Sequence, residues 1–221
     1  MNDGKLNIVF LGPPGAGKGT QAVGLSREFN IPHISTGDIF RAEMKAETEL
    51  GRLARSYIDD GNLVPDDVVI KIIERRLQQE DTRGGYILDG FPRTIPQAEE
   101  LDKMLRGLGT ALSAAIYLEA AEDVIIQRLS GRRVCRQCGA IYHLVNMPPA
   151  REGICDKCGG ELYQRPDDRP EAIRHRLEEY ARKTAGLIQY YQAEGLLRKV
   201  DAGIEKEKTY ALLRDILNDL K

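Results

Sequence analysis

A glycine-rich segment near the start of the chain has the residue types that bind phosphate. Residues 12–18 read GPPGAGK and fill the pattern G-x-x-x-x-G-K, directly after an apolar run and directly before a helical pattern. In that setting backbone N–H groups surround a phosphate, the helix N-terminus adds partial positive charge, and Lys18 reaches the terminal phosphates. A glycine-rich turn with a surface lysine is the alternative, but the flanking strand and helix favour a phosphate site.

One position of this segment departs from the common pattern. The residue after Lys18 is Gly19, where a serine or threonine hydroxyl usually contacts magnesium, and the hydroxyl comes one place later, at Thr20. Asp89 follows the apolar run Tyr86–Leu88, and a carboxylate at the end of a strand can position magnesium through its waters. We therefore expect Asp89 to help hold magnesium. A polar residue that simply ends a strand is the other interpretation.

Four cysteines form a second set of residues that could do chemistry. Cys135 with Cys138, and Cys155 with Cys158, make two C-x-x-C pairs with sixteen residues between them. This spacing is typical of a tetrahedral structural zinc site, in which four thiolates leave no open position for water. Two disulfides or an iron site are the alternatives. We expect zinc to stabilise a small lobe and to take no part in the reaction.

The elements that position these residues follow from the hydrophobic pattern. Short apolar runs separated by amphipathic helical stretches predict an α/β fold, with a parallel sheet covered by helices. The apolar runs are Leu6–Leu11, a short strand-like piece at His33, Tyr86–Leu88, Ala115–Leu118 and Leu197–Val200, and the helical stretches are about Thr20–Phe29, Pro96–Leu108, Glu122–Leu129 and Pro170–Ala193.

Two segments interrupt this alternation and are predicted to be insertions. Residues 35–64 carry charged helical pieces, Gly37–Lys45 and Leu50–Asp60, with few residues suited to a deep core. Residues 131–168 are rich in cysteine, glycine, proline and arginine, which is typical of a small separate lobe. The expected core domain consists of residues 1–34, 65–130 and 169–221.

The composition limits the partners that the chain can have. With 32 lysines and arginines against 34 acidic residues, the formal charge is -2, so no chain-wide basic field exists to hold nucleic acid or an acidic membrane. The N-terminal region is charged at Asp3 and Lys5, and its apolar run is too short for a signal sequence. No long apolar heptad demands a partner. We therefore expect a cytoplasmic monomer without nucleic-acid or membrane partners.

The order of the motifs resembles the nucleoside monophosphate kinases, and most of all the adenylate kinase family with a long lid. The resemblance rests on residues 12–20, on Ser35-Thr36-Gly37-Asp38 and above all on DGFPR at 89–93 with Gln97 four places later. It implies a P-loop three-layer fold with a central parallel five-stranded sheet, a helical AMP-binding insertion and a zinc-binding lid. It also implies reversible phosphoryl transfer from magnesium ATP to AMP, which gives two ADP and maintains adenine nucleotide homeostasis.

The resemblance also implies residue roles. AMP would lie between the first insertion and the sheet, with Thr36 and Gln97 near its adenine and Arg41 and Arg93 on its phosphate, where guanidinium forks fit well. The residues implied for AMP are Thr36, Arg41, Asn62, Leu63, Val64, Gly90, Phe91, Pro92, Arg93, Gln97, Arg165 and Arg176. Those implied for ATP are Gly15, Ala16, Gly17, Lys18, Gly19, Thr20, Arg132, Ile141, Tyr142 and Ile204. Those implied for catalysis are Lys18, Arg93, Arg128, Arg132, Arg165 and Arg176.

Phosphoryl transfer needs positioned phosphates and neutralised charge, with little covalent work for the protein. The AMP phosphate, with a second pKa near ~6, is already largely ionised at pH 7, so no general base is required. We therefore do not expect His33, His143 or His175 to be catalytic. Both insertions are expected to close over the nucleotides, because water is a competing acceptor.

Two alternatives remain open from the sequence. A kinase of the same fold could act on UMP, CMP or GTP, although Thr36 and Gln97 favour AMP by resemblance and the lid is too long for the short-lid pyrimidine kinases. A zinc-ribbon nucleic-acid binder joined to an NTPase would explain the cysteine pairs and the arginines near them, but the net charge and the motif at 89–93 argue against it. Those arginines are Arg132, Arg133, Arg136 and Arg151.

Overall fold

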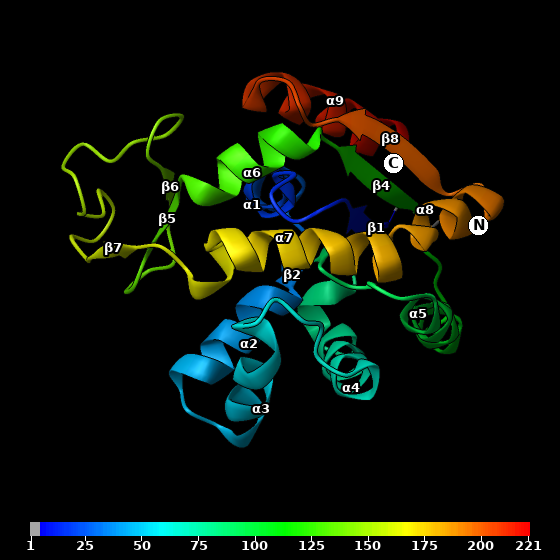
Figure 1. Cartoon of the computed structure of the whole chain (residues 1–221). Coiled ribbons are helices and arrows are strands. Elements are labelled where there is room, and N and C mark those ends of the chain that lie inside the picture. The colour runs from blue at the N-terminus through cyan, green and yellow to red at the C-terminus, as the bar shows by residue number, and fades with distance from the viewer. Residues whose placement is uncertain (1–4) are drawn as a thin grey trace.

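The computed structural model describes residues 5–221 and is built around one parallel β-sheet (Figure 1). The strand order is β2-β3-β1-β4-β8, and every neighbouring pair is parallel. The central strands are almost continuous apolar runs because helices shield both of their faces. The predicted α/β fold with a five-stranded parallel sheet is confirmed. The strands are β1 (Leu6–Leu11), β2 (His33–Ser35), β3 (Gly85–Asp89), β4 (Ala114–Glu119) and β8 (Leu197–Asp201).

The expected core segment 1–34 begins before the described part of the chain. Residues 1–4, and with them the charge predicted at Asp3, lie outside the described residues.

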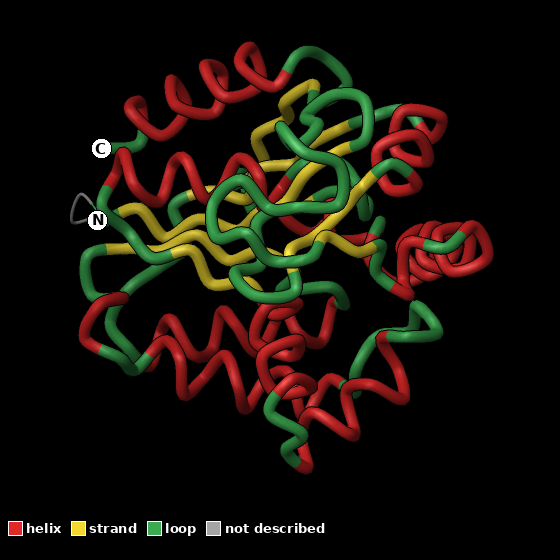
Figure 2. Tube along the Cα trace, turned by 90° about the vertical axis from the view of Figure 1, so that its left-hand side faces the viewer, coloured by secondary structure: helices red, strands yellow, loops and turns green. Residues whose placement is uncertain are grey.

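Helices cover both faces of the sheet. In β1, Leu6, Ile8 and Phe10 point to one face, and Val9 and Leu11 point to the other. The first face packs against α1 and α9, and the second packs against α4, α5 and α8. Figure 2 shows the strands between these two helical layers. The helices are α1 (Lys18–Phe29), α4 (Asp66–Leu77), α5 (Ile95–Gly107), α8 (Gly186–Ala193) and α9 (Lys206–Asp219).

Two of these helices, α4 and α9, add to the predicted elements. Each buries residues at four-residue intervals, such as Val69, Ile73 and Leu77 in α4, a helical signal that is present in the sequence. The helical stretch expected over Pro170–Ala193 is confirmed in extent, but a π-helical turn divides it into α7 (Pro170–Glu179) and α8. No helix within residues 5–221 has the length and apolar character needed to cross a bilayer.

The first insertion contains a hairpin of two helices, α2 (Thr36–Lys45) and α3 (Glu49–Ile58). The Thr48 hydroxyl caps α3 by accepting the Gly51 N–H at 2.9 Å. Gly51 also lets the two helices approach closely, because a Cβ there would lie 2.1 Å from the backbone oxygen of Glu43. The hairpin therefore packs through backbone contact and needs little apolar surface of its own.

The second insertion folds around a separate antiparallel sheet of order β6-β5-β7. Figure 1 shows this lobe beyond the ends of α6 and α7, away from the main sheet. It approaches the α2–α3 hairpin, because Lys45 Nζ donates to the Arg136 backbone oxygen at 3.4 Å. The remaining elements are α6 (Glu122–Ser130), β5 (Arg132–Cys135), β6 (Ile141–His143), β7 (Leu162–Tyr163) and the short 3-10 helices Glu80–Thr82 and Pro166–Asp168.

The pairing of β1 with β3 depends on a glycine. Gly85 has a φ of 119°, and a Cβ at this position would lie 2.6 Å from the Leu6 carbonyl oxygen and 2.8 Å from the Leu6 nitrogen. Both atoms belong to the backbone of β1, and Leu6 and Gly85 are partners in the register. A side chain at position 85 would therefore force the two central strands apart.

We predict that Gly85→Ala lowers the free energy of unfolding by about 2–4 kcal/mol, because backbone strain adds to a clash inside the sheet. In a chain of this size each kcal/mol lowers the melting temperature by about 2–4 °C. Gly84→Ala is the matched control, since an added Cβ there meets nothing within 4 Å among the described residues. Calorimetry of the two variants measures the difference, and equal melting temperatures would contradict this account.

Candidate functional site

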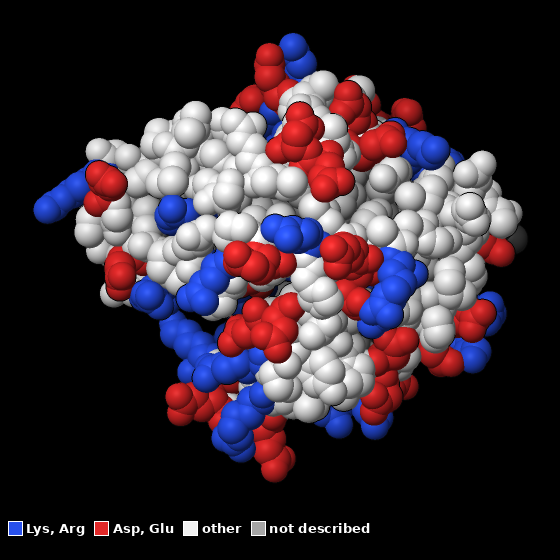
Figure 3. All heavy atoms as spheres, viewed as in Figure 1, with Lys and Arg blue, Asp and Glu red and all other residues white. Residues whose placement is uncertain are grey.

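A cavity of about 780 Å³ opens at the carboxyl ends of β1, β2 and β3. Ligands of parallel α/β proteins bind at this edge of the sheet. The cavity extends from the sheet between the α2–α3 hairpin and the β5–β7 lobe, since Phe40 and Arg41 line one side and Ile141 and Tyr142 line the other. Figure 3 shows basic side chains along the hollow between these two lobes.

The phosphate loop forms one wall of the cavity. Gly12, Gly15 and Gly17 have φ values of 138°, 84° and 95°, which let the chain turn sharply from β1 into α1. Lys18 is the first residue of α1, and its Nζ donates to the carbonyl oxygens of Gly12 at 2.7 Å and Pro13 at 2.9 Å. The ammonium group is thus held across the mouth of its own loop, where a phosphate would meet it.

The surroundings of Lys18 weaken its hold on a proton. Burial lowers the pKa of Lys18 to about 8, and the positive charges of Arg93, Arg176 and Arg132 act in the same direction. Asp89 opposes these effects. The ammonium group is therefore charged at pH 7, and a bound anion would keep it charged at higher pH.

Asp89 lies at the end of β3, beside the loop. Burial favours the neutral acid, but hydrogen bonding to His33 and the charge of Lys18 prevail and lower the pKa of Asp89. The His33 Nε2 atom lies 3.4 Å from Asp89 Oδ2. A Cβ at Gly19 would lie 3.2 Å from the same oxygen, so the glycine leaves room for the carboxylate. The site thus offers an ionised carboxylate next to the phosphate loop, as coordination of magnesium through water requires.

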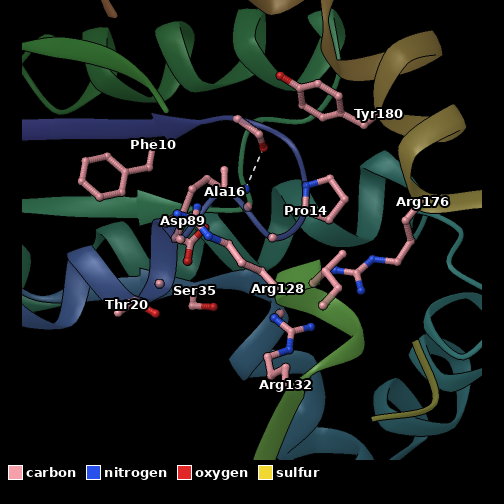
Figure 4. Close-up of a pocket in the computed structure, with 18 of the residues that line it drawn as sticks. Phe10, Pro14, Ala16, Thr20, Ser35, Asp89, Arg128, Arg132, Arg176 and Tyr180 are labelled. Atoms are coloured by element: carbon pink, nitrogen blue, oxygen red, sulfur yellow. Dashed lines mark hydrogen bonds between the residues drawn. The ribbon is translucent and has the colours of Figure 1, made fainter. Parts of the chain in front are cut away.

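Two arginines share one buried carboxylate. Arg132, at the start of β5, pairs with Asp168 through two donors on one guanidinium edge, Nε and Nη2, with 2.7 Å from Nε to Oδ2. Arg176, on α7, lies 3.2 Å from Asp168 Oδ1 and 3.1 Å from Asp167 Oδ2. Asp168 has no exposed surface, and its buried carboxylate pairs with both of these arginines. Figure 4 shows Arg128, Arg132 and Arg176 directed toward one space, with Asp89 at its edge.

Arg165 lines the cavity as a buried cation with a donor that is unpaired in the described chain. It is 8% exposed, and its Nε has no hydrogen-bond partner within residues 5–221. Burial lowers the pKa of Arg165 to about 10, and repulsion from Arg41 and Arg132 adds to this effect. A buried guanidinium with an unused donor and cationic neighbours favours an anionic ligand.

The opposite side of the cavity joins the DGFPR segment to α2. Gly90 has a φ of 83°, and its carbonyl oxygen accepts hydrogen bonds from Thr36 Oγ1 at 3.0 Å and Arg93 Nε at 2.9 Å. A Cβ at Gly90 would lie 2.6 Å from Thr36 Oγ1, so this junction requires glycine. Arg41 is held on α2 by Asp38 at 2.5 Å. These contacts place the Arg93 guanidinium beside the Thr36 hydroxyl, and the positive charge of Arg41 contributes to the lowered pKa of Arg93, after burial and Arg176.

The four cysteine sulfurs form one cluster in the β5–β7 lobe. They lie within 4.8 Å of one another, with 3.4 Å between Cys135 and Cys158 and 3.5 Å between Cys138 and Cys155. A disulfide needs about 2.05 Å, whereas four thiolates at about 2.3 Å from a central ion stand close to 3.8 Å apart. Tyr142 packs into the cluster, with its hydroxyl 3.5 Å from Cys155 Sγ. The donor set fits a tetrahedral metal ion.

The residues predicted to bind nucleotides lie around the same cavity, with Phe91 as an exception. Phe91 is fully buried in the hydrophobic core and does not line the cavity, so the structure gives no support to its predicted contact with AMP. Whether the others contact nucleotides stays a prediction. The predicted residues that line the cavity are Gly15, Ala16, Gly17, Lys18, Gly19, Thr20, Thr36, Arg41, Asn62, Leu63, Val64, Asp89, Gly90, Pro92, Arg93, Gln97, Arg128, Arg132, Ile141, Tyr142, Arg165, Arg176 and Ile204.

Three further residues organise the site without having been predicted to do so. Asp167 and Asp168 bind the arginines of the lobe and of α7, and His33 contacts Asp89. The two aspartates directly follow Arg165-Pro166 in the sequence, and such an acidic pair next to functional arginines was a usable signal. For His33 no such signal exists, because its partner comes from a strand more than fifty residues away.

Comparison with known proteins relates the chain to one family. The family model described as "Adenylate kinase" matches residues 10–196. The adenylate kinase of Caldicellulosiruptor bescii is 55% identical over 192 residues, which cover 87% of this chain and 89% of the relative. That of Bacillus licheniformis is 50% identical over 212 residues, or 96% and 98% of the two chains. That of Archaeoglobus fulgidus is 50% identical over 216 residues, or 98% and 100%.

We predict that the affinity of the free protein for ATP falls as the pH rises above about 8, the pKa of Lys18. Above this pKa the ligand must bind together with a proton, so the dissociation constant should rise about tenfold per pH unit until the pKa of the complex is reached. Calorimetric titration with ATP between pH 7 and 10 measures this dissociation constant. Lys18→Arg should bind with a flatter profile, because its charge persists. An equal decline in both proteins would contradict the role of Lys18.

Proposed function

We infer that this chain, which belongs to the adenylate kinase family, transfers the terminal phosphoryl group of ATP to AMP and forms two ADP in a reversible reaction. One observation carries the inference beyond family membership. Cationic side chains from the phosphate loop, the core, and the second insertion converge on one cavity, where Arg165 has an unused donor. Such a site suits two polyanionic ligands placed end to end.

We propose that ATP occupies the side of the cavity formed by the phosphate loop. The backbone from Gly15 to Thr20 and the Lys18 ammonium group would bind its phosphates. Arg128 and Arg132 line the cavity as well, and Arg128 Nη2 donates to the Ile204 backbone oxygen at 3.4 Å. The adenine of ATP would then lie among Ile141, Tyr142 and Ile204, which the resemblance implies for ATP binding.

We propose that AMP occupies the side between α2 and the DGFPR segment. Arg41 and Arg93 would bind its phosphate, and Thr36 and Gln97 would face its adenine. The segment from Asn62 to Val64, which returns from the α2–α3 hairpin, lines this side as well. In this arrangement the AMP phosphate and the terminal phosphate of ATP would lie next to each other, close to Arg165 and Arg176.

The proposed mechanism depends on position and charge. Lys18 and the arginines hold the donor and acceptor phosphates in line and stabilise the negative charge that spreads over the transferred group. The acceptor phosphate needs no general base, because it is already ionised. Magnesium bound with ATP would add positive charge at the phosphates, and Asp89 is the residue that would hold it through water. The segments 35–64 and 131–168 would exclude water by closing over both ligands.

We propose that the metal of the cysteine cluster is zinc. Its four thiolates would fill a tetrahedral coordination sphere and leave no position for a substrate, which gives the ion a structural role. The lobe around it buries few apolar residues, namely Val134, Cys135, Tyr142, Cys155 and Leu162. Metal binding would therefore supply much of its folding free energy. The proposal also includes a cytoplasmic, monomeric enzyme without nucleic-acid or membrane partners, and the comparisons do not favour the zinc-ribbon alternative.

We predict that Arg176→Ala lowers kcat for ADP formation by about 10²–10³-fold, because a donor to the transferred phosphoryl group is lost. The measurement is a nucleotide-resolved assay with magnesium ATP and either AMP, CMP, UMP or GMP. The unmodified protein should form its diphosphate product rapidly with AMP alone.

Arg174→Ala is the matched control, since Arg174 is an exposed arginine on the same helix. It should retain normal turnover, and the melting temperatures of both variants show that each is folded. A similar loss in both variants would overturn the role of Arg176. Turnover with a pyrimidine nucleotide in place of AMP would overturn the proposed specificity.

We predict that removal of the metal loosens the lobe before the core melts. A chelator should make residues 131–168 sensitive to proteases and lower kcat, while the core retains most of its melting temperature, because the main sheet shares no metal ligand with the lobe. Zinc, but not magnesium, should restore both properties. A single unfolding transition that chelation leaves unchanged would argue against this role.

A further inference from the structure

Asp66 links the starts of two helices behind the proposed AMP site. It is the first residue of α4, and its Oδ1 accepts a hydrogen bond from Gln97 Nε2 at 2.7 Å. Its Oδ2 accepts one from the Thr94 hydroxyl, also at 2.7 Å. Thr94 in turn caps α5 by accepting the N–H of Gln97 at 3.3 Å. Asp66 itself does not line the cavity, whereas Gln97 does.

These contacts fix the orientation of the Gln97 side-chain amide. Its oxygen Oε1 accepts the backbone N–H of Arg93 at 2.8 Å, while its nitrogen donates to Asp66. A flipped amide would set a donor against the Arg93 N–H and an acceptor against the Asp66 carboxylate. Both contacts would become repulsive in a residue that is only 1% exposed. The amide therefore has one favourable orientation.

The fixed Gln97 amide can still donate one hydrogen bond and accept one. Nε2 carries a second hydrogen and Oε1 a second lone pair, and the contacts to Asp66 and Arg93 use one of each. A donor and an acceptor side by side match the edge of adenine, which offers N1 as an acceptor and its amino group as a donor. Hypoxanthine presents the reverse pattern, with a protonated N1 and a carbonyl oxygen.

We propose that Asp66 is a positioning residue that sets the base specificity of the nucleoside monophosphate site by locking the orientation of Gln97. The proposal rests on the proposed function, in which Gln97 faces the adenine of AMP. Asp66 touches neither base nor phosphate and acts through the amide alone. Its carboxylate supplies one of the two contacts that make the flipped amide unfavourable, because it can only accept hydrogen bonds, whereas an asparagine amide in its place can accept or donate.

The test compares kcat/KM for AMP with kcat/KM for inosine monophosphate, at saturating magnesium ATP. Asp66→Asn should lower the AMP-to-IMP ratio about tenfold. The change should arise from a higher KM for AMP, while KM for ATP stays unchanged. Asp67→Asn is the matched control, because Asp67 is exposed in the same helical turn and carries the same charge. It should keep the ratio of the unmodified protein. Equal ratios for the two variants would overturn the proposal.

Two further variants separate a positioning role from a general loss of structure. Asp66→Glu keeps the charge at the helix start but moves the carboxylate, so it should also lower the ratio while the melting temperature is retained. In a Gln97→Ala background, Asp66→Asn should cause no further change in the ratio. An additional loss in that background would show that Asp66 acts by another route and would overturn the proposal.

Failure of the underlying function would look different. If Gln97→Ala alone left the AMP-to-IMP ratio unchanged, then Gln97 would not contact the base, and the proposed AMP site itself would be wrong. If Gln97→Ala lowered the ratio but Asp66→Asn did not, the AMP site would stand and the role of Asp66 would fall.

Discussion

Repulsion among cationic side chains around one cavity is the constraint on which the rest of the structure depends. Burial lowers the pKa of Lys18, and the positive charges of Arg93, Arg176 and Arg132 lower it further. The fold holds these groups together in two ways. Carboxylates compensate the arginines, as Asp168 does for two of them, and backbone carbonyl oxygens hold the lysine. The result is a site prepared for phosphate before any ligand arrives.

Some of these cations belong to the main sheet and its loops, and others belong to the separate β5–β7 lobe. Lys18 and Arg93 stand at the carboxyl edge of the main sheet, whereas Arg132 belongs to a lobe joined to the core through α6 and the Arg165–Asp168 return. Asp168 sits in that return and connects the lobe to α7 through Arg132 and Arg176. Phosphates that bind the same arginines would compete with the carboxylate. Under the proposed function, ligand binding and the position of the lobe would thereby be coupled through one shared set of charges.

The sequence predicts the parts of the site that lie close together in the chain. The phosphate loop, the cysteine pairs and the DGFPR segment are local patterns, and the structure has the loop and DGFPR at one cavity and the cysteines in one cluster. Contacts between distant strands and helices are harder to foresee. The pairings of His33 with Asp89 and of Asp66 with Gln97 depend on which strands and helices become neighbours. Helix α9 shows a further limit, since its apolar positions are spaced like those of a helix but lie among many charged residues.

The central position of β1 has a consequence for how the chain acquires its structure. This strand leaves its backbone groups unpaired until β3 and β4 join it, and β3 begins only at Gly85. The last strand, β8, pairs with β4 near residue 200. On a ribosome, β1 is therefore made well before the two strands that pair with it. Parallel pairings over such separations form slowly, so β1 should need protection until β3 and β4 have emerged, and the sheet should be complete only after β8 has been made.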